Sequence, residues 1–379
     1  MRRPEIPLYL ALLLSAFGVL GLLPDWGLAL RQSLFTLVGV ILFFYISRFN
    51  VRLIVMNSKV AYYITLALLV AVLLFGGGGG VRRWFNLGFI NFQPSEIAKV
   101  TVPLYLMSLR GTVEKLIFGL IPWVLILVEP DLATSSVILV LTLYVIFITA
   151  EDLKFVLLLF SILIAPIASF SKVLFWGFVA AITSSFVILR ASLGWIVGTL
   201  ILVIAIGLIT PILWNRGLKE YQRRRILAML NPQENSEVLW QTYQSRIALA
   251  NAGPFGKGIR GATQKNYGFL PAAHTDFAFT SIVEVYGYVV GFLLLLLLFM
   301  LPFSLFYMSF SPDPYLRMMA SAGGMFFLYQ TSVNLMSVLG LLPIAGIPLP
   351  FITYGGSHLL AEWAWLGLVY GAYRWRVET

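Results

Sequence analysis

The stretch from Gln244 to Gly287 reads QSRIALANAGPFGKGIRGATQKNYGFLPAAHTDFAFTSIVEVYG. It is polar and rich in glycine, whereas most of the chain around it is apolar. His274 stands two residues before Asp276, and the stretch runs directly into an apolar segment that carries Glu284. Its glycine-rich part also holds the basic residues Lys257, Arg260 and Lys265. A basic loop with an aspartate at a helix entrance is where we expect chemistry in so apolar a protein.

The composition places the chain in a membrane. It has 379 residues, of which 60% are hydrophobic and 11% are charged, and its mean hydropathy is +0.91. Soluble domains carry roughly 25% charged residues. Apolar runs long enough to cross a bilayer as helices recur along the chain, and the alternating pattern of a membrane barrel is absent. We therefore predict an all-α polytopic membrane protein.

The apolar runs predict about twelve spans, because each is roughly the length that a helix needs to cross the bilayer. The first, from Pro7 to about Leu30, is too long for a signal peptide and reads as an uncleaved span. We treat residues 1–379 as a single transmembrane domain. The predicted spans are 7–30, 33–49, 60–75, 96–109, 114–128, 132–149, 153–170, 173–189, 194–214, 281–308, 318–341 and 354–374.

The basic residues predict the orientation of the spans. The chain has a net charge of +10, and its basic residues stand between apolar runs, which suits lipid head groups rather than nucleic acid. Short loops on one side carry Arg2, Arg3, Arg48, Arg52, Lys59, Arg110, Lys115, Lys154, Arg190, Arg317, Arg374 and Arg376. Those on the other side carry only Arg31, Arg82, Arg83 and Lys172. The excess predicts that both termini are cytoplasmic.

Three loops then face outward. Residues 76–95 form an amphipathic re-entry loop or an interfacial aromatic anchor, and their sequence leaves both readings open. Residues 215–280 form a loop too long for a mere connector, with an excess of positive charge that suits a phosphorylated ligand. Residues 342–357 are rich in proline and glycine, and irregular backbone at membrane depth is tolerated where it lines a cavity.

Asp276 has two readings from the residues alone. As a helix N-cap its carboxylate would accept backbone N–H groups. If Thr275 caps instead, Asp276 lies in the first turn, where partial burial would raise its pKa and make it a general base. Glu284 lies about two helical turns further on and could share its face. His274 is read as a structural hydrogen-bonding residue.

Other ionisable residues stand at the ends of spans. Glu96 and Lys99 are three residues apart in QPSEIAK, which suits an ion pair on one helix. Glu129 and Asp131 flank a proline in VEPDLATS and form either a solvated turn or ligands near the outer mouth. The chain has no cysteine and only two histidines, which argues against a thiolate or histidine metal site.

Four motifs in order along the chain resemble the SEDS family (shape, elongation, division and sporulation). They are FNLGFINFQPSEIAK, EPDLATS, the stretch that ends in HTDF, and GIPLPFITYGGSHLL. The resemblance covers nearly the whole chain. It implies a core of ten membrane helices, so that the predicted spans include an extra hairpin, most simply near residues 153–190.

The resemblance implies a peptidoglycan glycosyltransferase that polymerises lipid II outside the cytoplasmic membrane of a bacterium. Asp276 is then the catalytic residue. The other family positions fall on residues that would bind substrate: Glu96, Lys99, Arg246, Lys257 and Ser357. We add Arg260, Lys265 and Glu284 as further substrate-binding candidates. The resemblance implies a class B penicillin-binding protein, the nascent glycan strand and membrane proteins of the elongation complex as partners.

The sequence departs from the family pattern at Glu129, Ala133, Ala272 and Val285, which weakens any role for carboxylates at those places. No metal ligand set is predicted, although Mg²⁺ or Mn²⁺ bridging a pyrophosphate and a carboxylate would be chemically reasonable. A lipid II flippase is the alternative function. Charges deep within several spans would favour a flippase, whereas charges near the outer ends favour chemistry at the outer face.

Overall fold

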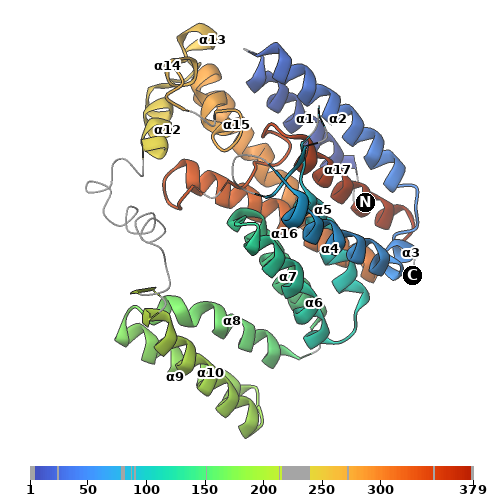
Figure 1. Ribbon diagram of the computed structural model, residues 1–379, viewed down its shortest axis with the longest axis vertical. Coiled ribbons are helices and arrows are strands. Elements are labelled where there is room, and N and C mark those ends of the chain that lie inside the picture. Colours follow the sequence, from blue (N-terminus) through green and yellow to red (C-terminus); the bar gives the residue numbers. More distant parts are fainter. Residues whose placement is uncertain are drawn as a thin grey trace. The chain divides into compact units, whose positions relative to one another are not determined.

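The architecture is described from a computed structural model. It defines residues 5–23, 25–77, 82–86, 88, 91–150, 152–212, 214–215, 240–270, 273–344 and 346–376, and the side chains of 265 and 266 are not described. These residues are almost entirely helical (Figure 1). The long and mainly apolar helices are α1 (Glu5–Leu22), α2 (Trp26–Ile46), α4 (Ser58–Phe75), α5 (Pro94–Ser108), α6 (Thr112–Val128), α7 (Leu132–Thr149), α8 (Leu153–Ala168), α9 (Lys172–Ile188), α10 (Leu193–Ile212), α15 (Ala278–Ser309), α16 (Pro314–Val338) and α17 (Gly356–Arg374).

Each predicted span corresponds to one of these helices. Within the described residues, α1, α2, α4, α7, α10 and α15 are long and apolar enough to cross a bilayer. The chain is therefore a multi-pass membrane protein. The region of the predicted extra hairpin contains α8 and α9, which are apolar but shorter.

The first connection lies earlier than predicted. The apolar run that we assigned to one span up to about Leu30 is divided, because α1 ends at Leu22 and α2 begins at Trp26. Asp25 caps α2 by accepting the N–H of Leu28 at 3.1 Å. Arg31 consequently lies within α2 rather than in a loop. The pair Pro24–Asp25 was the available signal, since proline followed by a capping residue marks a helix boundary.

The chain divides into two compact units. One comprises residues 1–145 and 239–379, and the other comprises residues 146–238. In the second unit α8, α9 and α10 pack against one another. All the residues of the candidate site described below belong to the first unit.

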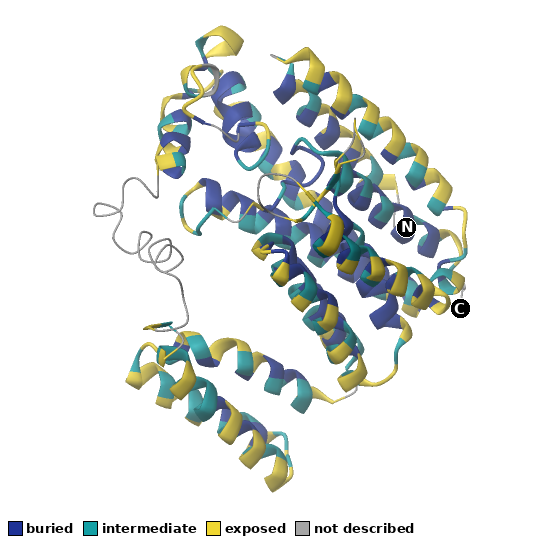
Figure 2. Cartoon of the chain, viewed as in Figure 1, coloured by how far each residue is buried: buried dark blue, intermediate teal, exposed yellow. Residues whose placement is uncertain are grey.

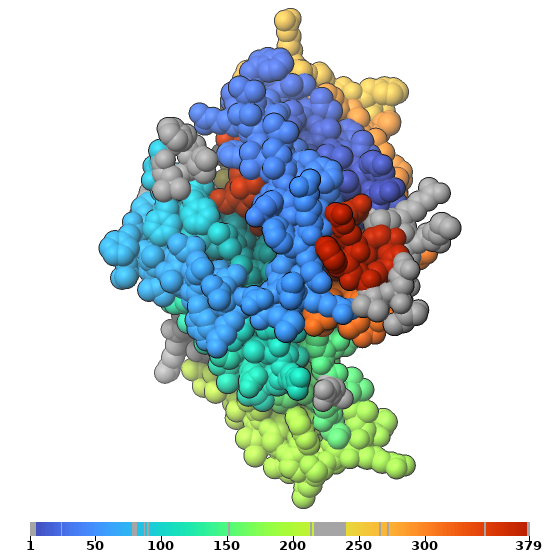
Figure 3. Space-filling model, turned by 90° about the vertical axis from the view of Figure 1, so that its right-hand side faces the viewer, coloured from blue at the N-terminus to red at the C-terminus, as the bar shows by residue number. Residues whose placement is uncertain are grey.

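In the first unit α15 packs against α16 and α1, while α17 packs against α2 and α5. Buried residues, dark blue in Figure 2, follow α5, α16 and α17. Near the ends of the membrane helices, the Trp375 indole N–H donates to the carbonyl of Arg48 at 3.2 Å. Figure 3 shows this face, where the red C-terminal segment lies beside the blue segment near residue 50.

Short elements occupy the connections. A short helix, α3 (Val51–Met56), which the sequence did not predict, precedes α4. The loop before α5 carries a hairpin of β1 (Phe85–Asn86) and β2 (Asn91–Phe92), in which Phe85 pairs with Phe92. The long loop before α15 contains α12 (Trp240–Asn251), α13 (Gly258–Gly261) and α14 (Thr263–Asn266). Its residues 216–239, with much of the predicted positive charge, lie outside the described residues.

Candidate active site

Asp276 lies just before α15 and does not cap it. The N-cap position is Phe277, and no side chain donates or accepts a capping hydrogen bond there. Both capping predictions, by Asp276 and by Thr275, are therefore wrong. The helix begins at Ala278, one residue too late for Asp276 to be its N-cap and two residues too late for Thr275. The carboxylate of Asp276 accepts no hydrogen bond from any of the described residues, so it remains available for another partner.

The main chain at Asp276, in contrast, is firmly held. Three consecutive carbonyl groups each accept a hydrogen bond from a distant part of the chain. The Tyr354 N–H donates to His274 at 3.0 Å, and the Thr353 hydroxyl donates to Thr275 at 3.3 Å. The amide of Asn334 donates to Asp276 at 3.1 Å. The last outer loop and α16 thus fix the backbone that carries the carboxylate.

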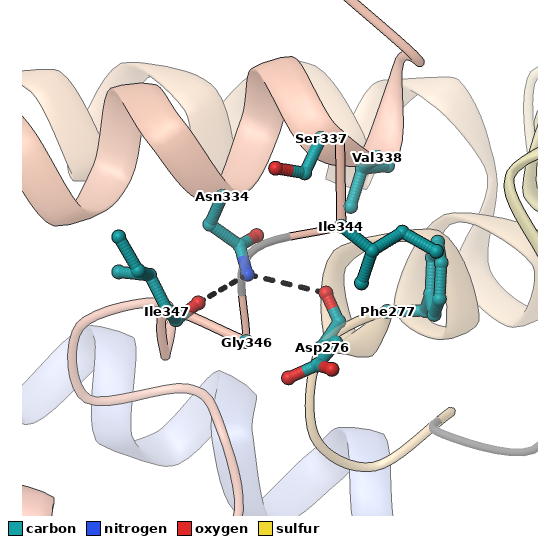
Figure 4. Close-up of a pocket in the computed structure, with 8 residues that line it drawn as sticks. All are labelled: Asp276, Phe277, Asn334, Ser337, Val338, Ile344, Gly346 and Ile347. Atoms are coloured by element: carbon teal, nitrogen blue, oxygen red, sulfur yellow. Dashed lines mark hydrogen bonds between the residues drawn. The ribbon is translucent and has the colours of Figure 1, made fainter. Parts of the chain in front are cut away.

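A small pocket adjoins Asp276. It is lined by Asp276, Phe277, Asn334, Ser337, Val338, Ile344, Gly346 and Ile347 (Figure 4). The lining is mostly apolar, and burial raises the pKa of Asp276 above its ordinary value of 3.8. A carboxylate with a raised pKa beside a pocket is suited to accept a proton from a hydroxyl group. None of these lining residues is basic.

Glu284 is placed elsewhere. Asp276 precedes the helix, so the predicted shared helical face does not exist. The buried carboxylate of Glu284 instead accepts the backbone N–H of Gln264 at 2.9 Å and anchors α14. Its carbonyl accepts the N–H of Lys257 at 3.0 Å.

The GPFGKG loop enters a break in α15. The backbone of Gly287 is non-helical, with φ 89° and ψ 178°. Across this break the Tyr288 N–H donates to Gly253 at 2.9 Å and the Val289 N–H donates to Pro254 at 3.2 Å. These bonds replace some of the backbone hydrogen bonds that α15 would otherwise make within itself, so the loop completes the hydrogen bonding of the helix at the break. The backbone of Lys257 is held by its own N–H bond to the Glu284 carbonyl, and its side chain is exposed.

The other predicted cations differ in their surroundings. The guanidinium of Arg246 donates to the Leu339 carbonyl from two nitrogens, at 2.9 and 2.7 Å. It therefore holds the C-terminal end of α16 in this structure. Arg260 is exposed, and the side chain of Lys265 lies outside the described ones. The positions of Arg260 and Lys257 on the loop leave both side chains facing outward.

Glu96 and Lys99 form the predicted ion pair, which is buried. The Lys99 ammonium donates to both carboxylate oxygens, at 2.6 and 2.7 Å. The Lys99 carbonyl accepts the indole N–H of Trp365 at 3.2 Å. The ion pair thus lies within α5, and the backbone carbonyl of Lys99 joins α5 to α17.

Gln93 joins the first and last outer loops. Its side-chain amide donates to the Asp131 carboxylate at 2.8 Å, and its backbone N–H donates to the Ser357 hydroxyl at 3.4 Å. Ser357 in turn donates to the carbonyl of Asn91 at 3.2 Å. This arrangement brings together three of the four sequence motifs.

Glu129 and Asp131 are both buried, so the solvated-turn reading of VEPDLATS is wrong. The Asp131 carboxylate accepts the Thr134 N–H at 3.0 Å. The Glu129 carboxylate has no hydrogen-bond partner in the described structure. Its pKa is raised to about 8 by burial and by the charge of Asp131, against the opposing effect of Arg83.

Several site residues were not found from the sequence. Gln32 bridges the last loop, donating to the Thr353 carbonyl at 3.1 Å and accepting the Gly355 N–H at 3.3 Å. Glu362, fully buried on α17, accepts the Phe351 N–H at 2.8 Å. Asn334 was missed as well. The signal in each case was a polar side chain inside an apolar helix, which is by default paired or functional.

The described residues offer no group of three or more carboxylates, histidines or cysteines that could hold a metal ion. Mg²⁺ can nevertheless be held by one or two carboxylates together with substrate phosphates.

The fold and site define a multi-pass helical membrane protein with a carboxylate beside a pocket built by α16 and two connecting loops. The model of the cell cycle protein family FtsW/RodA/SpoVE matches residues 8–184 and 174–376. The chain thus belongs to this family, the SEDS family, and is RodA-like.

Named relatives agree with this assignment. The chain is 32% identical over 325 residues to peptidoglycan glycosyltransferase MrdB of Escherichia coli (strain K12), covering 81% of the chain and 75% of the relative. It is 30% identical over 384 residues to peptidoglycan glycosyltransferase RodA of Treponema pallidum (strain Nichols), covering 90% and 88%.

Solved structures share the fold. A chain from a peptidoglycan synthase complex, described as coordinating polymerization and crosslinking, matches with a TM-score of 0.74 and 27% identity. That match covers 97% of this chain and 96% of the other. RodA of Thermus thermophilus matches with a TM-score of 0.63 and 24% identity, covering 99% and 98%.

Proposed function

We propose that the chain polymerises lipid II into glycan strands at the outer face of the bacterial cytoplasmic membrane, with Asp276 as the general base. It is a peptidoglycan glycosyltransferase, as its named relatives are. The observation that carries the proposed role of Asp276 is its environment. The main chain is held by three hydrogen bonds, the carboxylate is left without a partner among the described residues, and burial raises its pKa.

The chemistry follows from a base in that position. The 4-hydroxyl oxygen of the acceptor's GlcNAc attacks the anomeric carbon of the lipid-linked donor strand. During this attack Asp276 accepts the proton of that hydroxyl group. The bond from that carbon to the lipid pyrophosphate breaks, and the pyrophosphate leaves with the electron pair. In-line attack on an α-linked pyrophosphate gives a β-linkage, so the reaction inverts.

The leaving pyrophosphate needs positive charge, and the cations of the long loop before α15 can supply it. We assign this role to Lys257, Arg260 and Lys265, because charge-assisted donors stabilise developing phosphate charge. We do not assign this role to Arg246, which acts on the site through its bonds to the end of α16 instead. A divalent cation, Mg²⁺ or Mn²⁺, would add positive charge at the pyrophosphate when bound with substrate.

The remaining wall of the proposed substrate site is formed by Glu96, Lys99 and Ser357 together with Gln93 and Asp131. The carbonyl of Lys99 joins α5 to α17, the ion pair neutralises the buried charges of Glu96 and Lys99, and Ser357 and Gln93 keep the two loops in contact. We propose that these groups support the protein surface that binds the substrate. Glu284 supports the basic loop through α14 and the backbone of Lys257.

Glycan polymerisation must be coordinated with crosslinking. One solved relative comes from a complex that joins the two activities. We therefore include in the proposal a class B penicillin-binding protein as partner and a role in cell elongation with other membrane proteins of the elongation complex. Nucleic acid is not a partner in this proposal.

The test is glycan-strand formation from purified lipid II by the chain reconstituted with its penicillin-binding partner. The wild type should form polymer, and Asp276→Asn and Asp276→Ala should not, although both remain folded and bound to the partner. Equal polymer from all three would remove Asp276 from the mechanism. No polymer from the wild type, in a preparation that translocates labelled lipid II, would establish the flippase instead.

A further inference from the structure

Asn334 lies where three parts of the first unit meet. It is on α16, a helix that is otherwise mainly apolar, and its side chain is only 4% exposed. Its amide nitrogen donates to the carbonyl of Asp276 at 3.1 Å and to the carbonyl of Ile347 at 2.8 Å. Both hydrogens of one amide group are thus used to join α16, the last outer loop and the backbone before α15.

The oxygen of the same amide has no partner. Asn334 Oδ1 is buried and makes no hydrogen bond in the described structure. The contribution of the side chain to the site therefore comes from its two donors alone. Leaving a buried amide oxygen unsatisfied costs free energy, so a purely apolar residue would suit simple packing at this position better.

The backbone carbonyl of Asp276 and its side-chain carboxylate point in different directions. Figure 4 shows the Asp276 carbonyl directed towards Asn334 and the carboxylate directed away from it. The carbonyls of His274 and Thr275 are held by the last loop. The Asp276 carbonyl is held by Asn334, whose second donor holds the last loop as well.

We infer that Asn334 is a positioning residue for Asp276, which fixes the backbone of Asp276 relative to the last outer loop and thereby aims the carboxylate. This inference rests on the proposed function. Without the two donors, the Asp276 carbonyl itself is no longer held, and only the bonds to the carbonyls of His274 and Thr275 still join the turn to the last loop. A displacement of about 1 Å at a reacting group can lower a rate by roughly 100-fold.

The substitution Asn334→Asp isolates the donors, because it keeps the shape of the side chain. An ionised aspartate would face the carbonyl oxygens of Asp276 and Ile347 with no hydrogen to donate. Asn334→Ala removes the donors without adding charge. The matched control is Gln330→Met, one turn earlier on α16, because the fully buried amide of Gln330 makes no hydrogen bond in the described structure.

The measurements are kcat and KM for lipid II polymerisation, the pH–rate profile and the thermal midpoint, each with the penicillin-binding partner present. For Asn334→Asp and Asn334→Ala we expect kcat to fall about 10- to 100-fold with KM within about twofold. In Asn334→Ala the acid limb of the profile should move to lower pH, because a loosened Asp276 is better solvated, whereas the added negative charge in Asn334→Asp opposes that shift. Gln330→Met should resemble the wild type.

Three results would overturn the inference. They are wild-type kcat in both variants, an equal loss in Gln330→Met, and a loss of folded protein in both variants with an unshifted pH profile in what remains. The proposed function fails in a different way. In that case the wild type itself forms no polymer, or Asp276→Asn keeps full activity.

Discussion

Gly287 and Gly256 touch backbone to backbone where the GPFGKG loop crosses the break in α15. A Cβ added to Gly287 would lie 2.3 Å from the Gly256 nitrogen. Both glycines also have positive φ, 89° and 79°. Side chains are therefore excluded at this crossing by space and by backbone conformation together.

Gly287→Ala is expected to destabilise the protein by about 3 kcal/mol or more, because it combines overpacking with a strained φ. Thermal unfolding in detergent measures the effect. The control is Gly177→Ala on α9, where an added Cβ meets nothing within 4 Å. That variant should be neutral or slightly stabilising. Equal midpoints for the two variants would contradict the close crossing.

Arg246 provides a second prediction, because the structure gives it a different task from the one predicted. Its guanidinium caps the carbonyl end of α16, so Arg246→Gln should lower stability by about 1 kcal/mol and leave KM for lipid II unchanged. Lys257→Gln should do the reverse, raising KM without moving the thermal midpoint. A raised KM in Arg246→Gln at unchanged stability would restore its substrate-binding role.

The span pattern could be predicted because apolar length is a local property of the sequence. Almost every long apolar run became one helix. The exception was the first run, which is divided between α1 and α2 at a proline and a capping aspartate within a continuous apolar composition. The motifs likewise located Asp276 and the Glu96–Lys99 pair, since helical spacing decides whether residues three apart can meet.

The contacts that assemble the site could not be predicted. Gln32 and Thr353 are 321 residues apart in sequence, and Asn334 and Asp276 are 58 apart. No local periodicity encodes such pairs. The starting residue of α15 was missed for a related reason. Three tertiary hydrogen bonds hold residues 274–276 in a turn, and they take precedence over the capping tendency of Thr275 and Asp276.

The raised pKa of Asp276 leads to a prediction about activity. A general base must be ionised, so the polymerisation rate should rise with pH as Asp276 loses its proton. Because burial raises its pKa, the midpoint of this acid limb should lie above 3.8, the ordinary value for aspartate. Initial rates between about pH 4 and 8 measure it. A rate that does not change across this range would show that activity does not depend on the ionisation of a buried base.

Glu129 leads to a prediction about stability, with the opposite dependence on pH. Its pKa is about 8 in the folded chain against 4.5 for an ordinary glutamate. The folded state therefore binds the proton more tightly than the unfolded state does. The resulting stabilisation is complete below pH 4.5, and it is lost as the pH rises to about 8.

Glu129→Gln removes this dependence, because a neutral amide of nearly the same shape replaces a carboxyl group that must otherwise ionise while buried. We expect the variant to gain thermal stability relative to the wild type as the pH is raised from about 5 to 9. The comparison isolates Glu129, since all other titrating groups are common to both proteins. A constant difference between the two midpoints over that range would show that Glu129 ionises as freely in the folded chain as in the unfolded one.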